Sequence, residues 1–132
     1  MYLYFAYGSN MNPTRMTNRC PEAIDLGAGI LRNYKVVERL YADIDYEEGA
    51  ETEGVLYQIN EKNLKELDRR EGYPRVYTRF LVDIEHQGKV CQAITYKMTE
   101  QTRQDREGLK YPEEYRQICS VGAQIHKIRN NF

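Results

Sequence analysis

The chain opens with MYLYFAYGSNMNP, the residues Met1–Pro13, and the fold can be read outward from this stretch. Residues 1–7 are apolar and aromatic, which is typical of a buried strand. They run directly into the Gly-Ser-Asn of residues 8–10, a combination that favours a tight turn. Asn12 followed by proline is a strong helix start, so we expect a helix from there to about Cys20. The sequence therefore predicts a strand, a glycine turn and a helix in succession.

A turn that leads into a helix offers free backbone N–H groups, which form a natural cradle for an anion or an oxyanion. The turn is not a P-loop, because no Gly-Lys-Ser/Thr follows Gly8, and it is not a GxGxxG dinucleotide turn. Ser9 lacks the GxSxG surroundings of a nucleophilic serine. Its hydroxyl is therefore expected to cap or to bind.

A second landmark is the carboxylate of Glu71, at the end of a predicted helix over residues 60–71. Asn60 is suited to the N-cap, and Gly72 lies just past the C-terminus. At about 100° per residue, with Leu64 at zero, Leu67 falls near −60° and Glu71 near −20°. The carboxylate therefore shares the apolar face of the helix and should point inward.

An inward carboxylate at a helix C-terminus favours its neutral form, because burial and the partial negative charge of the last turn both raise its pKa. Asp68, three residues earlier, could add like-charge repulsion. An ordinary alternative stays open on helix geometry alone. Glu71 could pair with Arg69, Arg70 or Arg75, or its side chain could extend into water.

The remainder of the chain predicts further strands and one late helix. Strand patterns cover residues 30–40 and 54–59, and a hairpin with a turn at residues 86–88 joins the alternating segments 80–84 and 90–98. Residues 99–110 are expected to form a long loop or a loose helix. A final helix should start near Pro112, with one face formed by Tyr115, Ile118, Gly122 and Ile125.

Residues 43–53 carry six acidic side chains and no lysine or arginine. A calcium site is conceivable, but the spacing does not match an EF-hand loop. A solvated, self-repelling loop is the better interpretation. With roughly six strands and three helices in mixed order, we expect one α+β domain over residues 1–132, with a curled or barrel-like sheet whose closure cannot be read from the pattern.

Composition excludes several classes of function. Nineteen basic residues against twenty acidic ones give a net charge of −1, which argues against nucleic-acid or anionic-membrane binding. No apolar run reaches the roughly 20 residues of a membrane span, and no signal peptide is visible, so we expect a cytoplasmic protein. The three cysteines (Cys20, Cys91, Cys119) and two histidines (His86, His126) do not have the spacing of a disulfide framework, a metal site or a catalytic triad.

Four segments together resemble the gamma-glutamylcyclotransferase family. The run Tyr4–Met11 is similar to the YGSN-type signature that opens that family, and residues 67–72, with Glu71, are similar to its second landmark. Residues 93–96 resemble its tyrosine-bearing strand. Residues 111–115 with 121–123 resemble its late tyrosine and Gly-Ala helix.

The resemblance implies a small mixed β-barrel with flanking helices. It also implies ring closure of a γ-glutamyl group to 5-oxoproline, with release of the attached amino acid or amine. Glu71 would be the acid/base of the reaction, acting on a small-molecule γ-glutamyl substrate without metal or redox cofactor. The expected substrate-binding residues are Tyr7, Gly8, Ser9, Asn10, Met11, Tyr96 and Tyr115.

Several points stay open. The turn could hold an oxyanion or the substrate's α-carboxylate, and Tyr96 and Tyr115 could serve packing alone. Residues 71–79 look closer to the branch of the family that acts on γ-glutamyl amines, and the tail after Ala123 departs from the family pattern, so the substrate is undetermined. A non-catalytic module that binds a small anionic metabolite on the same fold is the alternative function.

Overall fold

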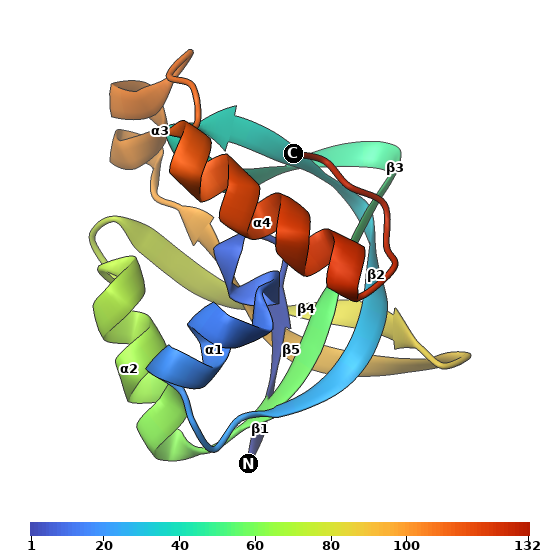
Figure 1. Cartoon of the computed structure of the whole chain (residues 1–132). Coiled ribbons are helices and arrows are strands. Elements are labelled where there is room, and N and C mark those ends of the chain that lie inside the picture. The colour runs from blue at the N-terminus through green and yellow to red at the C-terminus, as the bar shows by residue number, and fades with distance from the viewer.

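The computed structural model describes residues 1–132 and contains a closed five-stranded barrel with helices packed against its outside (Figure 1). The strands are β1 (Tyr2–Ala6), β2 (Ile24–Arg39), β3 (Tyr41–Ile59), β4 (Tyr77–His86) and β5 (Lys89–Met98). A short 3-10 helix, η1 (Ser9–Met11), follows β1, and the α-helices are α1 (Pro13–Arg19), α2 (Glu61–Glu71), α3 (Glu100–Arg106) and α4 (Glu113–Ile125). None of these helices has the length and apolar character that crossing a membrane requires.

The barrel closes through a parallel contact between β1 and β5, where Tyr4 lies opposite Ile94. The other neighbouring strands are antiparallel, and the order around the barrel is β1-β3-β2-β4-β5. The closure is brief, because β1 and β5 pair at one position and β2 and β4 at two. The predicted α+β class and the small mixed barrel with flanking helices are confirmed.

The element count differs from the prediction because two strands are longer than their sequence patterns. The predicted strand regions 30–40 and 54–59 belong to β2 and β3, which form one long hairpin of 16- and 19-residue strands. Five strands therefore replace the expected six. The segment 99–110 contains a defined helix, α3, which brings the α-helices to four. The two N-caps are as predicted: the side chain of Asn12 accepts hydrogen bonds at the start of α1, and that of Asn60 does so at the start of α2.

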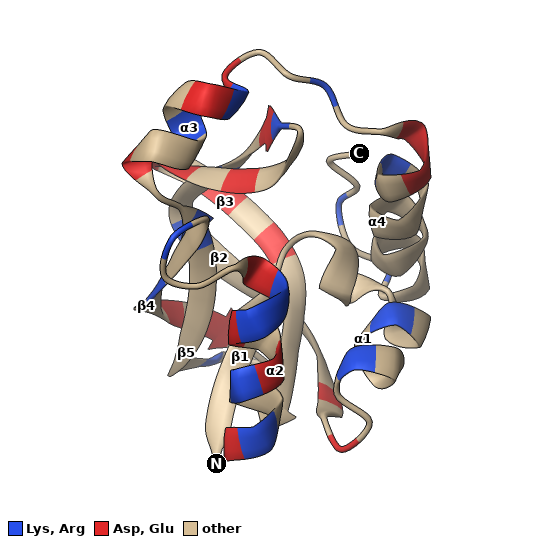
Figure 2. Ribbon diagram, turned by 90° about the vertical axis from the view of Figure 1, so that its left-hand side faces the viewer, with Lys and Arg blue, Asp and Glu red and all other residues tan.

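The prediction of a solvated loop at residues 43–53 is wrong, because this segment lies within β3. Figure 2 shows its acidic residues spread along the strand. Five of the six pair with cations that are distant in sequence or across the hairpin, so the self-repulsion that would favour a loop is neutralised. The pairs are Asp43 and Asp45 with Arg39 and Arg103, Glu47 with Lys35, Glu51 with Arg32, and Glu53 with Arg129.

Asp43 also ties one end of the barrel together. Its carboxylate is fully buried and accepts hydrogen bonds from the backbone N–H groups of Ile44 (2.8 Å) and Met98 (2.9 Å). The guanidinium of Arg39 donates a further bond at 2.8 Å. A buried charge is tolerated only when it is paired and hydrogen-bonded in this way. The start of β3 is thus fixed against the end of β5.

Two apolar clusters follow from the alternation of side chains along the strands. Phe5, Leu56 and Ile84 belong to a cluster built from strand residues, which fills the barrel. Tyr4 and Tyr57, which point the other way, join Leu64 and Leu67 of α2 and Met16 of α1 in a second cluster between barrel and helices.

Helix α4 crosses directly over the turn that follows β1, and Gly122 makes this approach possible. A Cβ atom on Gly122 would lie 2.6 Å from the backbone N of Asn12 and 2.6 Å from the backbone C of Met11. The predicted helix face is confirmed for Gly122, but Ile125 is 55% exposed, and Cys119 and Ala123 are the buried residues instead. Ile125 is the last residue of the helix.

We predict that Gly122→Ala lowers the free energy of unfolding by about 1–3 kcal/mol, because the added methyl meets backbone atoms that cannot move aside. Helix propensity alone would favour alanine by about 1 kcal/mol, so the sign of the change separates the two effects. Denaturant unfolding measures the difference. Gln124→Ala, at an exposed position of the same helix, should change stability by less than about 0.5 kcal/mol. A Gly122→Ala protein more stable than the parent would contradict the close packing.

Candidate active site

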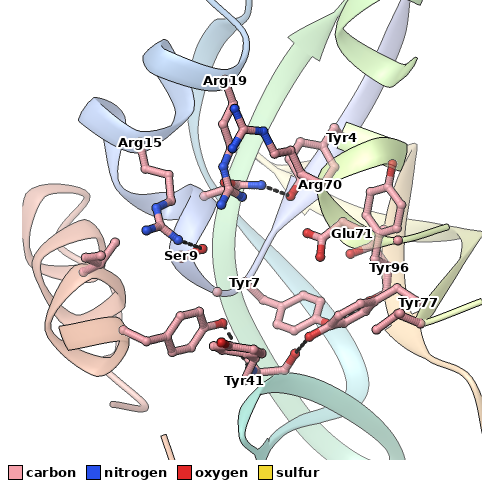
Figure 3. Close-up of a pocket in the computed structure, with 18 of the residues that line it drawn as sticks. Tyr4, Tyr7, Ser9, Arg15, Arg19, Tyr41, Arg70, Glu71, Tyr77 and Tyr96 are labelled. Atoms are coloured by element: carbon pink, nitrogen blue, oxygen red, sulfur yellow. Dashed lines mark hydrogen bonds between the residues drawn. The ribbon is translucent and has the colours of Figure 1, made fainter. Parts of the chain in front are cut away.

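A pocket of about 620 Å³ opens between the turn after β1, the C-terminal end of α2, the start of β3 and helix α4 (Figure 3). Elements from all parts of the sequence meet here, since η1, α2 and α4 are separated by some fifty residues each. Glu71 and six of the seven predicted binding residues line the pocket: Tyr7, Gly8, Ser9, Asn10, Tyr96 and Tyr115. Met11 does not, because it is 1% exposed and packs into the cluster between barrel and helices.

The turn at Gly8 presents backbone to the pocket. A Cβ atom on Gly8 would lie 3.0 Å from the hydroxyl oxygen of Tyr115 and 3.3 Å from Ala42, so a side chain would occupy the space between the turn and α4. The carbonyl groups of Gly8 and Ser9 accept the bonds that form η1. The first N–H groups of a helix have no partner within it, so they stay available to a ligand.

Asn10 holds the turn in place through both ends of its side chain and its carbonyl. Its amide donates to the hydroxyl of Tyr4 at 3.0 Å, and its side-chain oxygen accepts from Arg19 at 3.0 Å. The backbone carbonyl of Asn10 accepts from the hydroxyl of Tyr57 at 2.7 Å. Asn10 is 3% exposed. A buried side chain whose amide and oxygen are both hydrogen-bonded fixes the local backbone, so the turn is preorganised.

Glu71 is the last residue of α2, and Figure 3 shows its carboxylate pointing into the pocket. Gly72 ends the helix in the left-handed conformation (φ 67°), as the sequence predicts. Burial raises the pKa of Glu71 to about 7, while the positive charges of Arg19 and Arg15 oppose this shift. A carboxylate with this pKa gains and loses a proton near neutral pH.

The ion pair that the sequence left open for Glu71 does not form. Arg69 and Arg70 both turn back to Glu66, at 2.8 and 2.7 Å. Asp68 does not act on Glu71 as a bare like charge either, because its carboxylate accepts from the hydroxyl of Tyr96 at 2.6 Å and from Arg79 at 3.0 Å. Desolvation is therefore the dominant reason for the raised pKa of Glu71.

The two predicted tyrosines line the pocket, but their hydroxyls are bonded elsewhere. Tyr96 donates to Asp68, and Tyr115 accepts a hydrogen bond from the backbone N–H of Ala42 at 3.0 Å. Neither hydroxyl bonds to Glu71. A third hydroxyl, that of Tyr77, donates to the carbonyl of Ala42 at 2.9 Å. The backbone N–H and the carbonyl of Ala42 are therefore both hydrogen-bonded at the pocket wall.

Sequence reasoning missed the arginines of the pocket. Arg15 donates to the hydroxyl of Ser9 at 3.3 Å and Arg19 to Asn10, and neither forms an ion pair with a carboxylate of the chain. Their spacing of four residues on the helix after the turn was the available signal, because residues i and i+4 share a helix face. Tyr41, Tyr77 and Arg106 also line the pocket, and no local pattern marks them.

The charges around the pocket are unequal. Five arginines line it (Arg15, Arg19, Arg69, Arg70 and Arg106) against two acidic residues, Glu71 and Glu114. Such a site favours an anionic ligand. It combines this positive field with one carboxylate that can exchange a proton and with free N–H groups at the turn. These are the parts required to hold a carboxylate-bearing substrate and to transfer a proton on it.

Comparison with known proteins gives a consistent result. The family described as "Gamma-glutamyl cyclotransferase, AIG2-like" matches residues 4–117. The gamma-glutamylcyclotransferase of Bos taurus is 29% identical over 136 residues (92% of this chain and 70% of that protein), and that of Mus musculus is 28% identical over 145 residues (99% and 74%). A solved structure described as "Gamma-glutamyl cyclotransferase" superposes with a TM-score of 0.77 at 26% identity, covering 95% of this chain and 79% of that one.

The raised pKa of Glu71 predicts a pH-dependent cost in stability. The folded state holds a proton up to about pH 7, whereas the ordinary value is 4.5, so folding stability falls as pH rises between these values. Glu71→Gln should therefore gain about 1–3 kcal/mol in unfolding free energy relative to the parent on going from pH 5 to pH 8. Urea unfolding of both proteins at the two pH values measures this.

The matched control is Glu48→Gln, at an exposed position without an ion pair. Its stability relative to the parent should be the same at pH 5 and pH 8. If Glu71→Gln behaves like Glu48→Gln, the carboxylate of Glu71 is not desolvated.

Proposed function

The chain belongs to the gamma-glutamyl cyclotransferase, AIG2-like family, and on this premise we propose that it cyclises a γ-glutamyl amino acid or γ-glutamyl amine to 5-oxoproline and releases the attached amine. It is an enzyme of the gamma-glutamylcyclotransferase type, as the names of its relatives indicate. The residue roles given below are part of the proposal.

One observation carries the assignment of the chemistry: Glu71 has a pKa of about 7 and no ion-pair partner, and it faces a pocket lined by the glycine turn. A protein that only binds an anion gains nothing from a desolvated carboxylate in a positive pocket, because that carboxylate repels the ligand and costs stability. An acid/base catalyst requires a group of this kind, since proton transfer is most efficient when the pKa lies near the working pH.

In the first step the α-ammonium group of the substrate gives a proton to the ionised Glu71. The free amine nitrogen then attacks the γ-carbonyl carbon of the same molecule, which forms the new C–N bond and moves the carbonyl electron pair onto oxygen. The backbone N–H groups of Gly8, Ser9 and Asn10 are candidates to stabilise this oxyanion. Because attacking amine and carbonyl belong to one molecule, the protein's main task is to hold the substrate in the folded conformation.

In the second step the tetrahedral intermediate collapses. The oxygen electron pair re-forms the carbonyl, the bond to the leaving nitrogen breaks, and Glu71 delivers its proton to that nitrogen. The attacking nitrogen keeps one hydrogen as the lactam N–H, and its other extra proton passes to the released amine, which leaves as an ammonium group. The products are 5-oxoproline and an amine, no water is consumed, and Glu71 returns to its starting state.

The arginines of α1 supply the anion site of the proposed mechanism. Arg15 and Arg19 act electrostatically on Glu71 and are held at the turn by Ser9 and Asn10. The substrate's α-carboxylate is one atom away from the amine that Glu71 deprotonates, so a positive charge beside Glu71 is well placed to bind it. If Arg15 and Arg19 bind the α-carboxylate, the backbone N–H groups of the turn are available to bind the oxyanion. Tyr7, Tyr96 and Tyr115 would form the walls against which the substrate packs.

A cytoplasmic location and a freely diffusing small-molecule substrate complete the proposal. All three cysteines are free thiols. Unpaired, widely separated cysteines are typical of a reducing compartment.

The test is formation of 5-oxoproline from γ-glutamyl amino acids and γ-glutamyl amines. We expect product from at least one donor and a 10²- to 10⁴-fold loss of kcat/KM in Glu71→Gln, roughly the usual contribution of general acid/base catalysis. In the parent, kcat/KM should rise with pH through about pH 7 as Glu71 ionises. The variant should lose this limb of the profile.

Glu48→Gln is the matched control here too, because Glu48 is exposed, lies outside the pocket and forms no ion pair. It should keep the parental pH profile. Absence of 5-oxoproline from every donor, combined with binding of γ-glutamyl compounds, would instead establish the non-catalytic binding module. Near-parental activity of Glu71→Gln would remove Glu71 from the mechanism.

A further inference from the structure

Arg106, on α3, is the one arginine of the pocket whose guanidinium makes no hydrogen bond. It lines the pocket, and its Nη1 atom is buried without a partner. The guanidinium carbon lies 5.5 Å from the centre of the Tyr41 ring, which holds the group from one side. A buried donor without an acceptor is costly, so this N–H group is available to an acceptor on a ligand that enters the pocket.

The neighbouring acidic residues cannot fill this role because they are already engaged. Asp43 and Asp45 pair with Arg39 and Arg103, and Glu107 pairs with Arg39. The other arginines of the pocket are likewise occupied: Arg15 by Ser9, Arg19 by Asn10, and Arg69 and Arg70 by Glu66. Arg106 therefore differs from every other cation at the site.

Arg106 also lies at a different part of the pocket from the arginines of α1. Arg106 lies beside the ring of Tyr41, and Figure 3 shows Tyr41 on the side of the pocket away from Arg19. Two separated positive groups fit a substrate with two separated carboxylates. The α-carboxylate of the γ-glutamyl group stays close to the reacting amine, so the second carboxylate must belong to the leaving group.

We infer that Arg106, supported by the ring of Tyr41, binds a carboxylate on the leaving group and so selects γ-glutamyl α-amino acids over γ-glutamyl amines. This inference rests on the proposed function. A guanidinium can bind a carboxylate through two parallel hydrogen bonds, which gives both strength and orientation. Glu114 also lines the pocket and would repel a carboxylate ligand. Its side chain is exposed, so water and salt screen this repulsion.

Two donors that differ by one carboxylate test this specificity: γ-glutamyl-alanine and γ-glutamyl-ethylamine. The parent should prefer γ-glutamyl-alanine in kcat/KM by at least about tenfold, the scale of one well-placed charged hydrogen bond. Arg106→Gln should raise KM for γ-glutamyl-alanine about 10- to 100-fold and change γ-glutamyl-ethylamine by less than about threefold. Arg106→Lys, which keeps the charge without the planar fork, should retain part of the preference.

Arg116→Gln is the matched control, since it removes one exposed positive charge outside the pocket, where Arg116 pairs with Glu113. It should keep the parental donor preference. Equal losses for both donors in Arg106→Gln would indicate a structural role and overturn the inference, as would an unchanged preference.

Calorimetric binding of the same two compounds to Glu71→Gln, with and without Arg106→Gln, separates this inference from the proposed reaction. A parent protein that forms no 5-oxoproline refutes the reaction. The assignment of Arg106 still stands if γ-glutamyl-alanine binds more tightly than γ-glutamyl-ethylamine and the difference disappears with Arg106. It fails if the two compounds bind equally to the protein that retains Arg106.

Discussion

The contact on which the site depends is the close approach of α4 to the turn that follows β1. A Cβ atom of residue 122 would lie 2.6 Å from the backbone of Asn12 and Met11, and a Cβ atom of residue 8 would lie 3.0 Å from the hydroxyl of Tyr115. These two glycines let a helix from the end of the chain pack on a turn from its start. The pocket exists because this contact positions the turn, α4 and the first residues of β3 around one space.

The position of Glu71 in the pocket lowers the stability of the folded protein above about pH 5, because burial disfavours the ionised form of its carboxylate. Its carboxylate is buried among tyrosines, with arginines near enough to lower its pKa but with no direct ion pair. A structural carboxylate would be paired, as Asp43 is in this same protein with Arg39 and Arg103. The contrast between these two carboxylates distinguishes a group that holds the barrel together from a group that is free to exchange a proton.

The arginines of the pocket follow the same distinction. Those that bond Ser9, Asn10 or Glu66 are oriented by the protein itself, whereas Arg106 is oriented only by the ring of Tyr41. Asp45 and Glu107 form ion pairs with Arg39 and Arg103 and not with Arg106. The guanidinium of Arg106 is therefore available to a ligand. Recognition of the leaving group would thus come from a helix that carries no part of the proton transfer.

The sequence by itself determined the local elements: the opening strand, turn and helix, the capped helix with an inward Glu71, and the hairpin around residues 86–88. These follow from short-range periodicity, caps and turn residues. It did not determine barrel closure, the strand at residues 43–53 or the arginines opposite Glu71, and it placed Met11 in the pocket although Met11 is core. Only the tertiary structure decided these points, because pairing of strands and neutralisation of charge depend on residues that are far apart in the chain and meet only when it folds.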